Sequence, residues 1–189
     1  DFTFGYSLNV GINSAVGKYI AIASAHTIPC DNQWLVNLVE PLRDDKVAMV
    51  YGRQLGVESS KFSECEDFRR VFGDKRLRHY GDKFFANNAN SALPRHLWAR
   101  NSFDESLPGL EDIGWAKHWV EQGYYIVYEP SAALFHVHEE TWSQVQHRYY
   151  REAVAARAIG IKSRVSALPE VVREILFAKI DLIRSFYSI

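Results

Sequence analysis

The spacing of apolar positions alternates between two patterns along the chain. Runs of consecutive apolar residues predict buried strands, and apolar residues three or four apart predict helices that bury one face. The expected strands cover 19–23, 47–50, 84–93, 124–128 and 133–136. The expected helices cover 5–16, 31–42, 62–72, 94–99, 110–122, 141–159 and 169–188. Strands and helices alternate first and hairpin-like strands follow, which predicts an α/β fold with a mixed sheet flanked by helices.

Composition narrows the class of protein and of partner. The 189 residues suit one domain, and an apolar content of 47% is enough for a sizeable core. The formal net charge of −1 gives no electrostatic case for nucleic acid or for anionic lipid. We therefore expect no nucleic-acid partner.

Cysteine usage and hydropathy suggest where the protein works. Cys30 and Cys65 are not spaced as a metal or redox pair, which favours a reducing compartment. We recognise no secretory leader, and no run reaches the roughly 20 apolar residues that span a bilayer. The helix expected over 169–188 has a mixed polar face, which favours packing over lipid binding. We expect a cytoplasmic protein, with peripheral attachment at the inner face of the membrane as the alternative.

An acid pair at a helix start is the most informative feature. Glu111 and Asp112 follow the turn-forming Pro108-Gly109 and open an apolar-periodic segment. The helix dipole stabilises carboxylates there, so a pair of capping acids would look the same. A general base also needs an ionised carboxyl within reach of a substrate hydroxyl, and Asp112 meets that need. Trp115 lies one turn further on and is expected to wall the same pocket.

Histidines at strand ends are the second candidate group. Alternation along the strand over 133–136 places His136 and His138 on one face. Two imidazoles on one face can share a metal or bind a phosphate, although one core and one exposed histidine fit equally. Ser24 and His26 end another buried strand, at the edge where α/β sheets bind ligands.

Amides and arginines complete the polar candidates. Asn87, Asn88, Asn90 and Ser91 fall in a turn, where amides bind sugar hydroxyls but are also common turn formers. Arg148 and Arg151 lie about one turn apart on the helix over 141–159. The planar guanidinium group binds diphosphate well, so this pair can face a phosphate donor or simply be solvated.

These pieces together resemble, in order and spacing, the family-2 glycosyltransferases, whose fold is called GT-A. The resemblance runs from about Phe4 to about Gly160. Five stretches carry it: Phe4–Ile20 resembles the family's N-x-G…A-x-G-x-Y-I segment, Ser24–Leu35 its metal motif followed by P…W-L, Asn88–Arg95 its N-x-A-x-R strand, Phe103–Trp115 its F-D-E…E-D-x-D-W segment, and Tyr128–His136 its P-x-A-x-x-x-H strand.

The resemblance implies an inverting transfer of a sugar from a nucleotide-diphosphate donor to an acceptor hydroxyl, in polysaccharide or glycan synthesis. It implies a GT-A-like, partly Rossmann-type domain over 1–160 and a C-terminal amphipathic helical extension over 161–189. The implied roles are a base and its neighbour (Asp112, Glu111), donor or diphosphate binding (Asn9, Ser24, His26, Arg148), acceptor binding (Asn88, Asn90, Trp115) and metal binding (His26, His136, His138).

Two departures from the family pattern matter. The Asp-x-Asp position reads Ser24-Ala25-His26, so a divalent metal (Mn²⁺ or Mg²⁺) would be held without those acids, or His26 would contact the diphosphate directly. The nucleotide-binding strands that open the family's domain have no counterpart here. Their absence implies that a partner or a missing N-terminal segment covers an exposed face. The resemblance separately implies a glycan or lipid-linked acceptor.

Two other functions remain open from the sequence. A non-catalytic or truncated glycosyltransferase-like protein would bind a donor without transferring its sugar. A hydrolase that uses a metal held by His26, His136 and His138 would need an open coordination position and a bound water.

Overall fold

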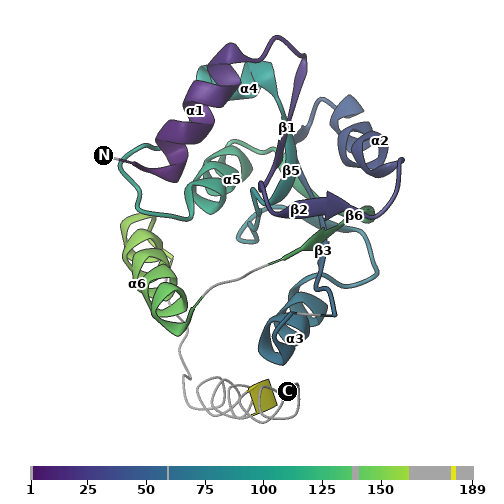
Figure 1. Cartoon of the computed structure of the whole chain (residues 1–189). Coiled ribbons are helices and arrows are strands. Elements are labelled where there is room, and N and C mark those ends of the chain that lie inside the picture. Colours follow the sequence, from purple (N-terminus) through teal and green to yellow (C-terminus); the bar gives the residue numbers. More distant parts are fainter. Residues whose placement is uncertain (1, 59, 138–140, 162–179, 182–189) are drawn as a thin grey trace.

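The fold is a mixed six-stranded sheet with helices on both faces (Figure 1). The computed structural model describes residues 2–58, 60–137, 141–161 and 180–181. Its strands are β1 (Tyr19–Ala23), β2 (Thr27–Pro29), β3 (Val47–Leu55), β4 (Leu77–His79), β5 (Asn90–Pro94) and β6 (Tyr125–His136). Its helices are α1 (Phe4–Ser14), α2 (Trp34–Val39), the 3₁₀ helix η1 (Glu40–Arg43), α3 (Phe62–Val71), α4 (Arg95–Arg100), α5 (Glu111–Glu121) and α6 (Trp142–Ala158).

The sheet runs in the order β1-β5-β3-β6-β2, and β4 pairs with β6 beside β2. The central pair, β3 and β6, is parallel, and every other pair is antiparallel. β3 is buried along most of its length, as expected for a central strand covered on both faces. The mixed α/β sheet expected from the sequence is therefore confirmed.

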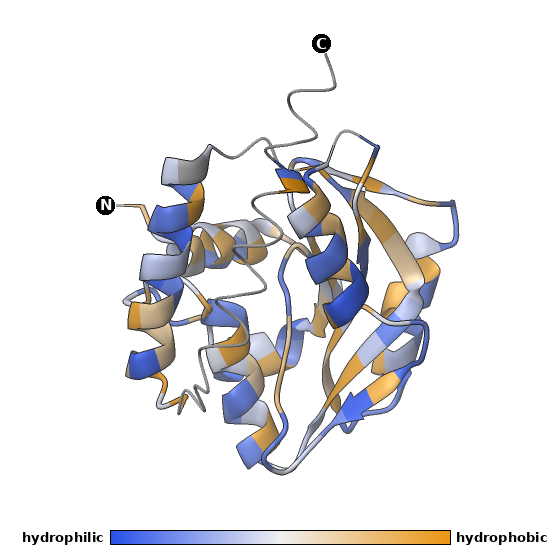
Figure 2. Cartoon of the chain, turned by 90° about the horizontal axis from the view of Figure 1, so that it is seen from below, coloured by the Kyte–Doolittle hydropathy of each residue, from blue (hydrophilic) through white to orange (hydrophobic). Residues whose placement is uncertain are grey.

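Two apolar clusters hold the layers together. The larger one packs α1, α4 and α5 on one face, where Trp98, Trp115 and Trp119 are almost fully buried. The smaller one packs α2 and η1 on the other face around Leu38 and Leu42. Figure 2 shows apolar residues along the strands and a mixture of polar and apolar residues on the covering helices. The central strand β3 is thus covered on both faces, whereas β1 and the end of β6 alternate between buried and exposed residues.

One long strand replaces the two strands expected over 124–128 and 133–136. β6 continues through Glu129 and Pro130, and its register against β3 shifts between Gly52 and Gln54. A side chain at Gly52 would collide with the carbonyl oxygen of Ala132, so the close approach at this irregularity requires glycine. The expected hairpin is therefore wrong, because a proline at a register shift does not end a strand.

Two short strands were not expected from the sequence. β2 and β4 have three residues each, and both are largely exposed, so neither leaves an apolar run. β5 begins only at Asn90, so 84–89 is an irregular segment and not the expected strand. The conformation of β2 and β4 therefore depends on pairing with β6 more than on local sequence.

Most expected helices are confirmed to within a residue or two. α6 begins with a capping box between Thr141 and Gln144, and α5 is followed by Gly123 with φ of 82°. The helix expected over 31–42 is shorter: α2 starts at Trp34 and gives way to η1, because Pro41 cannot continue the α-helical hydrogen bonds. The helix expected over 169–188 falls almost entirely outside the described residues, and the extension over 161–189 stays a prediction.

A contact distant in sequence caps α3. The Asp181 carboxylate accepts hydrogen bonds from the Phe62 backbone N–H at 2.5 Å and from the Ser63 hydroxyl at 2.5 Å. The helix has no side-chain cap of its own at Lys61. A carboxylate at a helix N-terminus satisfies unpaired N–H groups and suits the dipole. Among the described helices, none is both long and apolar enough to cross a membrane.

Candidate active site

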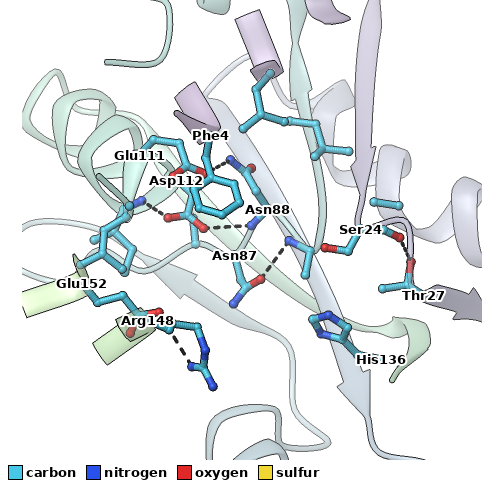
Figure 3. Close-up of a pocket in the computed structure, with 18 of the residues that line it drawn as sticks. Phe4, Ser24, Thr27, Asn87, Asn88, Glu111, Asp112, His136, Arg148 and Glu152 are labelled. Atoms are coloured by element: carbon cyan, nitrogen blue, oxygen red, sulfur yellow. Dashed lines mark hydrogen bonds and ion pairs between the residues drawn. The ribbon is translucent and has the colours of Figure 1, made fainter. Parts of the chain in front are cut away.

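A cavity of about 1230 Å³ opens where the ends of β1 and β6 meet α1, α5 and α6. Its volume exceeds the roughly 300–1,000 Å³ usual for a site that binds one small molecule, so it has room for two ligands. Asp112 and His136 lie on opposite sides of it, with Asn87 between them in the view of Figure 3. The cavity therefore brings together the acid pair and the strand-end histidines, which the sequence alone left unconnected.

The acid pair lies in the first turn of α5, directly after a residue in the left-handed backbone conformation. Leu110, which precedes Glu111, has φ of 56°, a conformation that costs a non-glycine residue about 1 kcal/mol or more. The turn at Pro108-Gly109 was expected, but the strained residue was not. This backbone conformation starts the helix at Glu111 and so places both carboxyls at the cavity.

Asn88 holds both acids. Its backbone N–H donates to Asp112 Oδ2 at 2.9 Å, and its side-chain amide donates to Glu111 Oε1 at 3.1 Å. The Ser91 hydroxyl donates in turn to Asn88 Oδ1 at 2.9 Å, which fixes the amide orientation. Asn88 lines the cavity, but its amide is engaged with protein groups, so its observed role is to position the acids.

Burial raises the pKa values of both carboxyls. The pKa of Asp112 is raised from 3.8 to about 7, mainly because the carboxyl loses contact with water and secondly because Glu111 carries a like charge. Hydrogen bonds from the backbone N–H groups of Asn88 and Ile113 oppose the rise. Burial also raises the pKa of Glu111. The two carboxyls titrate as a pair, and one of them gains its proton near neutral pH.

This shift predicts a pH dependence of stability. Because the folded-state pKa of Asp112 lies above its unfolded value of 3.8, the group favours folding below about pH 4 and loses this contribution as the pH rises towards 7. In Asp112→Asn that loss should disappear. The thermal unfolding midpoint of the variant, relative to that of the unsubstituted protein, should therefore increase as the pH rises from about 4 to about 8. A pH-independent difference between the two proteins would contradict the raised pKa.

The second half of the site is a stacked pair of histidines. His26 and His136 are 110 residues apart, and the antiparallel pairing of β2 with β6 brings them together. Their Nε2 atoms are 2.9 Å apart, and their rings stack with centroids 4.7 Å apart. His136 is 5% exposed, and its Nδ1 lies 2.6 Å from Gln54 Oε1. Phe68 of α3 stacks on the same ring, so His136 is held from two sides.

The histidine pair is the group best placed to hold a cation. The described residues include no cluster of three or more His, Cys, Asp or Glu side chains arranged for a metal. Two nitrogens bound to one ion at about 2.1 Å lie about 3.0 Å apart at an octahedral angle and about 3.4 Å apart at a tetrahedral angle, so the Nε2 separation of 2.9 Å between His26 and His136 fits the octahedral angle and would have to widen slightly for the tetrahedral one. The pair fits as two ligands, and the other positions would come from a bound ligand or water. His138, the third candidate, lies outside the described residues.

Three residues expected at the site belong to the core instead. Asn9 is 5% exposed and binds Trp98 Nε1 and the backbone of Phe103. Asn90 is fully buried and joins four elements through its amide. Trp115 is 2% exposed, donates to the Asn101 carbonyl and packs in the larger cluster. We correct all three expectations: none of these side chains lines the cavity, because their polar atoms already have partners inside the protein.

The remaining candidates do line the cavity. Ser24 lies at the end of β1, and its carbonyl accepts from the Thr27 hydroxyl at 2.7 Å. Arg148 projects from α6 and lies 3.9 Å from Glu152 on the next turn. Arg151 lies on the same wall, with its guanidinium carbon 5.2 Å from the centre of the Phe4 ring.

Sequence reasoning missed the residues that hold the histidines and the aromatic wall. Gln54 and Phe68 fix His136, yet neither stands in a motif that separates it from a core residue. Phe4 opens α1 and lines the cavity although it is 41% exposed. The sequence offers only a phenylalanine near the start of an expected helix, which is a weak signal because its exposure is visible only in the structure.

No protein-family model and no curated protein matches the sequence. Solved structures are similar in fold. A mannosyltransferase, PcManGT from Pyrobaculum calidifontis in complex with GDP-Man and Mn²⁺, aligns with a TM-score of 0.60 at 20% identity over 86% of this chain and 45% of that chain. GalNAc-T7 with UDP, GalNAc and Mn²⁺ aligns with a TM-score of 0.54 at 13% identity over 72% of this chain and 30% of that chain.

A mycobacterial protein aligns with a TM-score of 0.52 at 14% identity, over 77% of this chain and 47% of that chain. The chain thus spans less than half the length of each of these structures. At such identities the likeness concerns the fold alone. The chain has a GT-A-like glycosyltransferase fold, as the resemblance in sequence implied.

Proposed function

We propose that the protein is an inverting glycosyltransferase that moves a sugar from a nucleotide-diphosphate donor to an acceptor hydroxyl in glycan or polysaccharide synthesis. The single observation that carries the proposal is the placement of an acid pair and a histidine pair across one cavity on a GT-A-like fold. The transfer needs a base on one side of the sugar and a cationic group at the leaving diphosphate on the other.

The reaction follows from this placement. Asp112 in its ionised form accepts the proton of the acceptor hydroxyl. The acceptor oxygen then forms a bond with the anomeric carbon while the bond from that carbon to the diphosphate oxygen breaks, and the configuration inverts. Glu111 and Asn88 hold Asp112 in position. The donor diphosphate occupies the end of the cavity that is lined by Ser24 and His26, and it faces Arg148.

A divalent cation fits this proposal. His26 and His136 would hold it, and it would offset the charge that develops on the leaving diphosphate. The two solved transferases named above contain Mn²⁺, which makes a divalent metal plausible here. His136 keeps its orientation through Gln54 with or without an ion, because that contact uses the other ring nitrogen.

The direct test is a panel of nucleotide-diphosphate sugars that differ in base and sugar. Purified protein is incubated with each donor and a mixture of glycan acceptors, and released nucleoside diphosphate and sugar product are measured. Release with at least one donor, and a product with inverted anomeric configuration, is expected. Retained configuration would reject the inverting mechanism, and no donor binding across the panel would reject the proposal.

The ligand set predicts an order of metal preference. The candidate ligands among the described residues are two imidazoles, and imidazole ligands favour Zn²⁺ and Co²⁺ over Mn²⁺, and Mn²⁺ over Mg²⁺. Calorimetric titration of the purified chain should give affinities in that order. His26→Ala should weaken Zn²⁺ binding by about tenfold or more, whereas His96→Ala, which removes an exposed imidazole on α4, should leave it unchanged. Equal binding by all three proteins would place the metal elsewhere.

One observation favours a second function, a glycosyltransferase-like protein that binds a donor but does not transfer its sugar. Ser24 and His26 follow β1 at the Asp-x-Asp position of the family pattern, so neither position carries a carboxylate. Such a protein would bind a nucleotide-diphosphate sugar in calorimetry and release no nucleoside diphosphate under the conditions of the donor panel. Turnover that is lost in Asp112→Asn excludes this alternative.

A further inference from the structure

We propose that the acceptor carries an anionic group, and that this group binds Arg151 at the α1–α6 end of the cavity while the acceptor sugar stacks on Phe4. The inference rests on the proposed function and adds the chemical class of the acceptor. It concerns the part of the cavity away from the histidine pair, and it assigns Arg151 to the acceptor, whereas the sequence left Arg148 and Arg151 to face a phosphate donor or solvent.

The position of Phe4 points to the acceptor. Phe4 and Asp112 line the same cavity, and in the view of Figure 3 both lie at the opposite end of it from His136. The base must touch the acceptor hydroxyl, so the surface next to Asp112 is where the acceptor sugar lies. The ring of Phe4 is 41% exposed, which leaves apolar surface for the C–H face of a sugar.

Arg151 lies over the Phe4 ring, but it has no hydrogen-bond acceptor and no ion-pair partner among the described residues. Its Nε is buried without a hydrogen-bond acceptor, and its guanidinium group makes no ion pair with a described residue. Buried polar atoms in folded proteins nearly always have partners, so the unsatisfied Nε shows that protein groups do not saturate this guanidinium group. The side chain is half-buried at the cavity wall, so its terminal N–H groups can donate to a ligand. Its neighbour Arg148 differs, because it lies 3.9 Å from Glu152.

The acid pair does not supply the missing partner. Glu111 and Asp112 receive their hydrogen bonds from Asn88 and Ile113 and not from an arginine. The pKa of Asp112 is raised by burial and by Glu111, and no basic side chain is among the causes that lower it. Arg151 is therefore not neutralising the acids, and its charge is available to an anion that enters the cavity.

The shape of the guanidinium group narrows the class of anion. Its N–H donors match a carboxylate or a phosphate in two-point contact, and a neutral hydroxyl uses this geometry less well. The acceptor is therefore a sugar with an acidic substituent: a carboxylate on the ring, or a phosphate attached to it. Both have the same recognition chemistry, and the experiment separates them.

Three probes with one ring test the proposal: methyl glucoside, methyl glucuronide and the 6-phosphate of methyl glucoside. Binding to the full chain is followed by ligand-observed NMR titration. At least one anionic probe should bind about tenfold more tightly than the neutral one. Preference for the glucuronide identifies a carboxylate, and preference for the phosphate identifies a phosphorylated acceptor. Anionic probes that bind no better than the neutral one overturn the proposal.

Matched variants locate the site. Arg151→Gln should remove the preference for the anionic probe and leave the neutral probe unchanged, whereas Arg157→Gln, at an exposed position on the same helix, should change neither. Phe4→Leu should weaken all three probes together. His26→Ala should leave the preference intact, because a loss there would mean that the probe binds at the diphosphate end. An effect of Arg157→Gln equal to that of Arg151→Gln also overturns the proposal.

Because these titrations measure sugar binding, they are independent of turnover. Anion preference without turnover on the donor panel would reject the proposed transfer and keep the binding site. Turnover with neutral acceptors, unaffected by Arg151→Gln, would keep the transfer and reject the anionic acceptor.

Discussion

Asp112→Asn should lower sugar transfer by about 100-fold or more and leave the fold intact, because the amide cannot accept the proton of the acceptor hydroxyl. Asparagine keeps one acceptor oxygen, which can receive the Asn88 N–H bond, and gives up the bond from the Ile113 N–H to the other carboxyl oxygen, so the tip of α5 loses one of its two contacts with this side chain. In the unsubstituted protein, turnover should rise as the pH increases through about 7, since the pKa of Asp112 is raised to that value and only the ionised form acts as base. Steady-state rates with the donor found in the panel measure both effects.

The control for this substitution is Asp82→Asn, which removes an exposed carboxyl outside the cavity. It should retain full activity. Far-UV and near-UV circular dichroism of Asp112→Asn should match that of the unsubstituted protein. Near-normal turnover by Asp112→Asn would show that the acid pair serves only to cap α5, and the proposed mechanism would then be rejected.

Asn90→Ala should destabilise the fold by roughly 3 kcal/mol or more, the largest effect on stability that we expect from a single polar side chain here. Asn90 is fully buried and accepts from Trp34 Nε1 at 2.9 Å. Its amide donates to the carbonyl oxygens of Arg53 at 3.0 Å and Ala132 at 2.8 Å. Alanine would leave these groups without partners in a region from which water is excluded.

Urea unfolding followed by tryptophan fluorescence gives the free energy of unfolding. Asn37→Ala is the matched control: its amide makes one hydrogen bond, to the Ser131 carbonyl, at the surface, so its loss should cost about 1 kcal/mol or less. If both variants lose the same small amount, Asn90 has no special role in joining β5 to β3, β6 and α2.

The elements with strong local signals could be predicted from sequence. The apolar runs of β1 and β3 identify strands, of which β3 is buried and β1 is half exposed. Thr141 and Gly123 identify a start and an end of helices. β2 and β4 could not be predicted, because three exposed residues have no periodicity and their strand conformation comes from pairing with β6. β6 itself was divided in two because Pro130 looks like a break in sequence but lies at a register shift in the sheet.

The candidate site was predictable in its titratable groups and not in its amides. A pair of acids at a helix start and a histidine at a strand end have few roles, so Asp112 and His136 could be proposed from position alone. Asparagine serves turns, cores and ligands alike, and sequence does not separate these roles. Burial decides among them: Asn88 lies at the cavity, whereas Asn9 and Asn90 are enclosed and bonded within the core.

One helix–strand unit carries both halves of the site. α5 begins at the cavity with Glu111 and runs away from it, the chain reverses at Gly123, and β6 returns to end at His136. Insertions at the reversal are remote from substrate, whereas a change in the length of either arm would alter the span between base and cation. The outer turn can therefore accept changes in length, whereas the two arms set the distance between the carboxyl and the imidazole. Moving this chemistry to another scaffold would require transfer of the whole helix–strand unit.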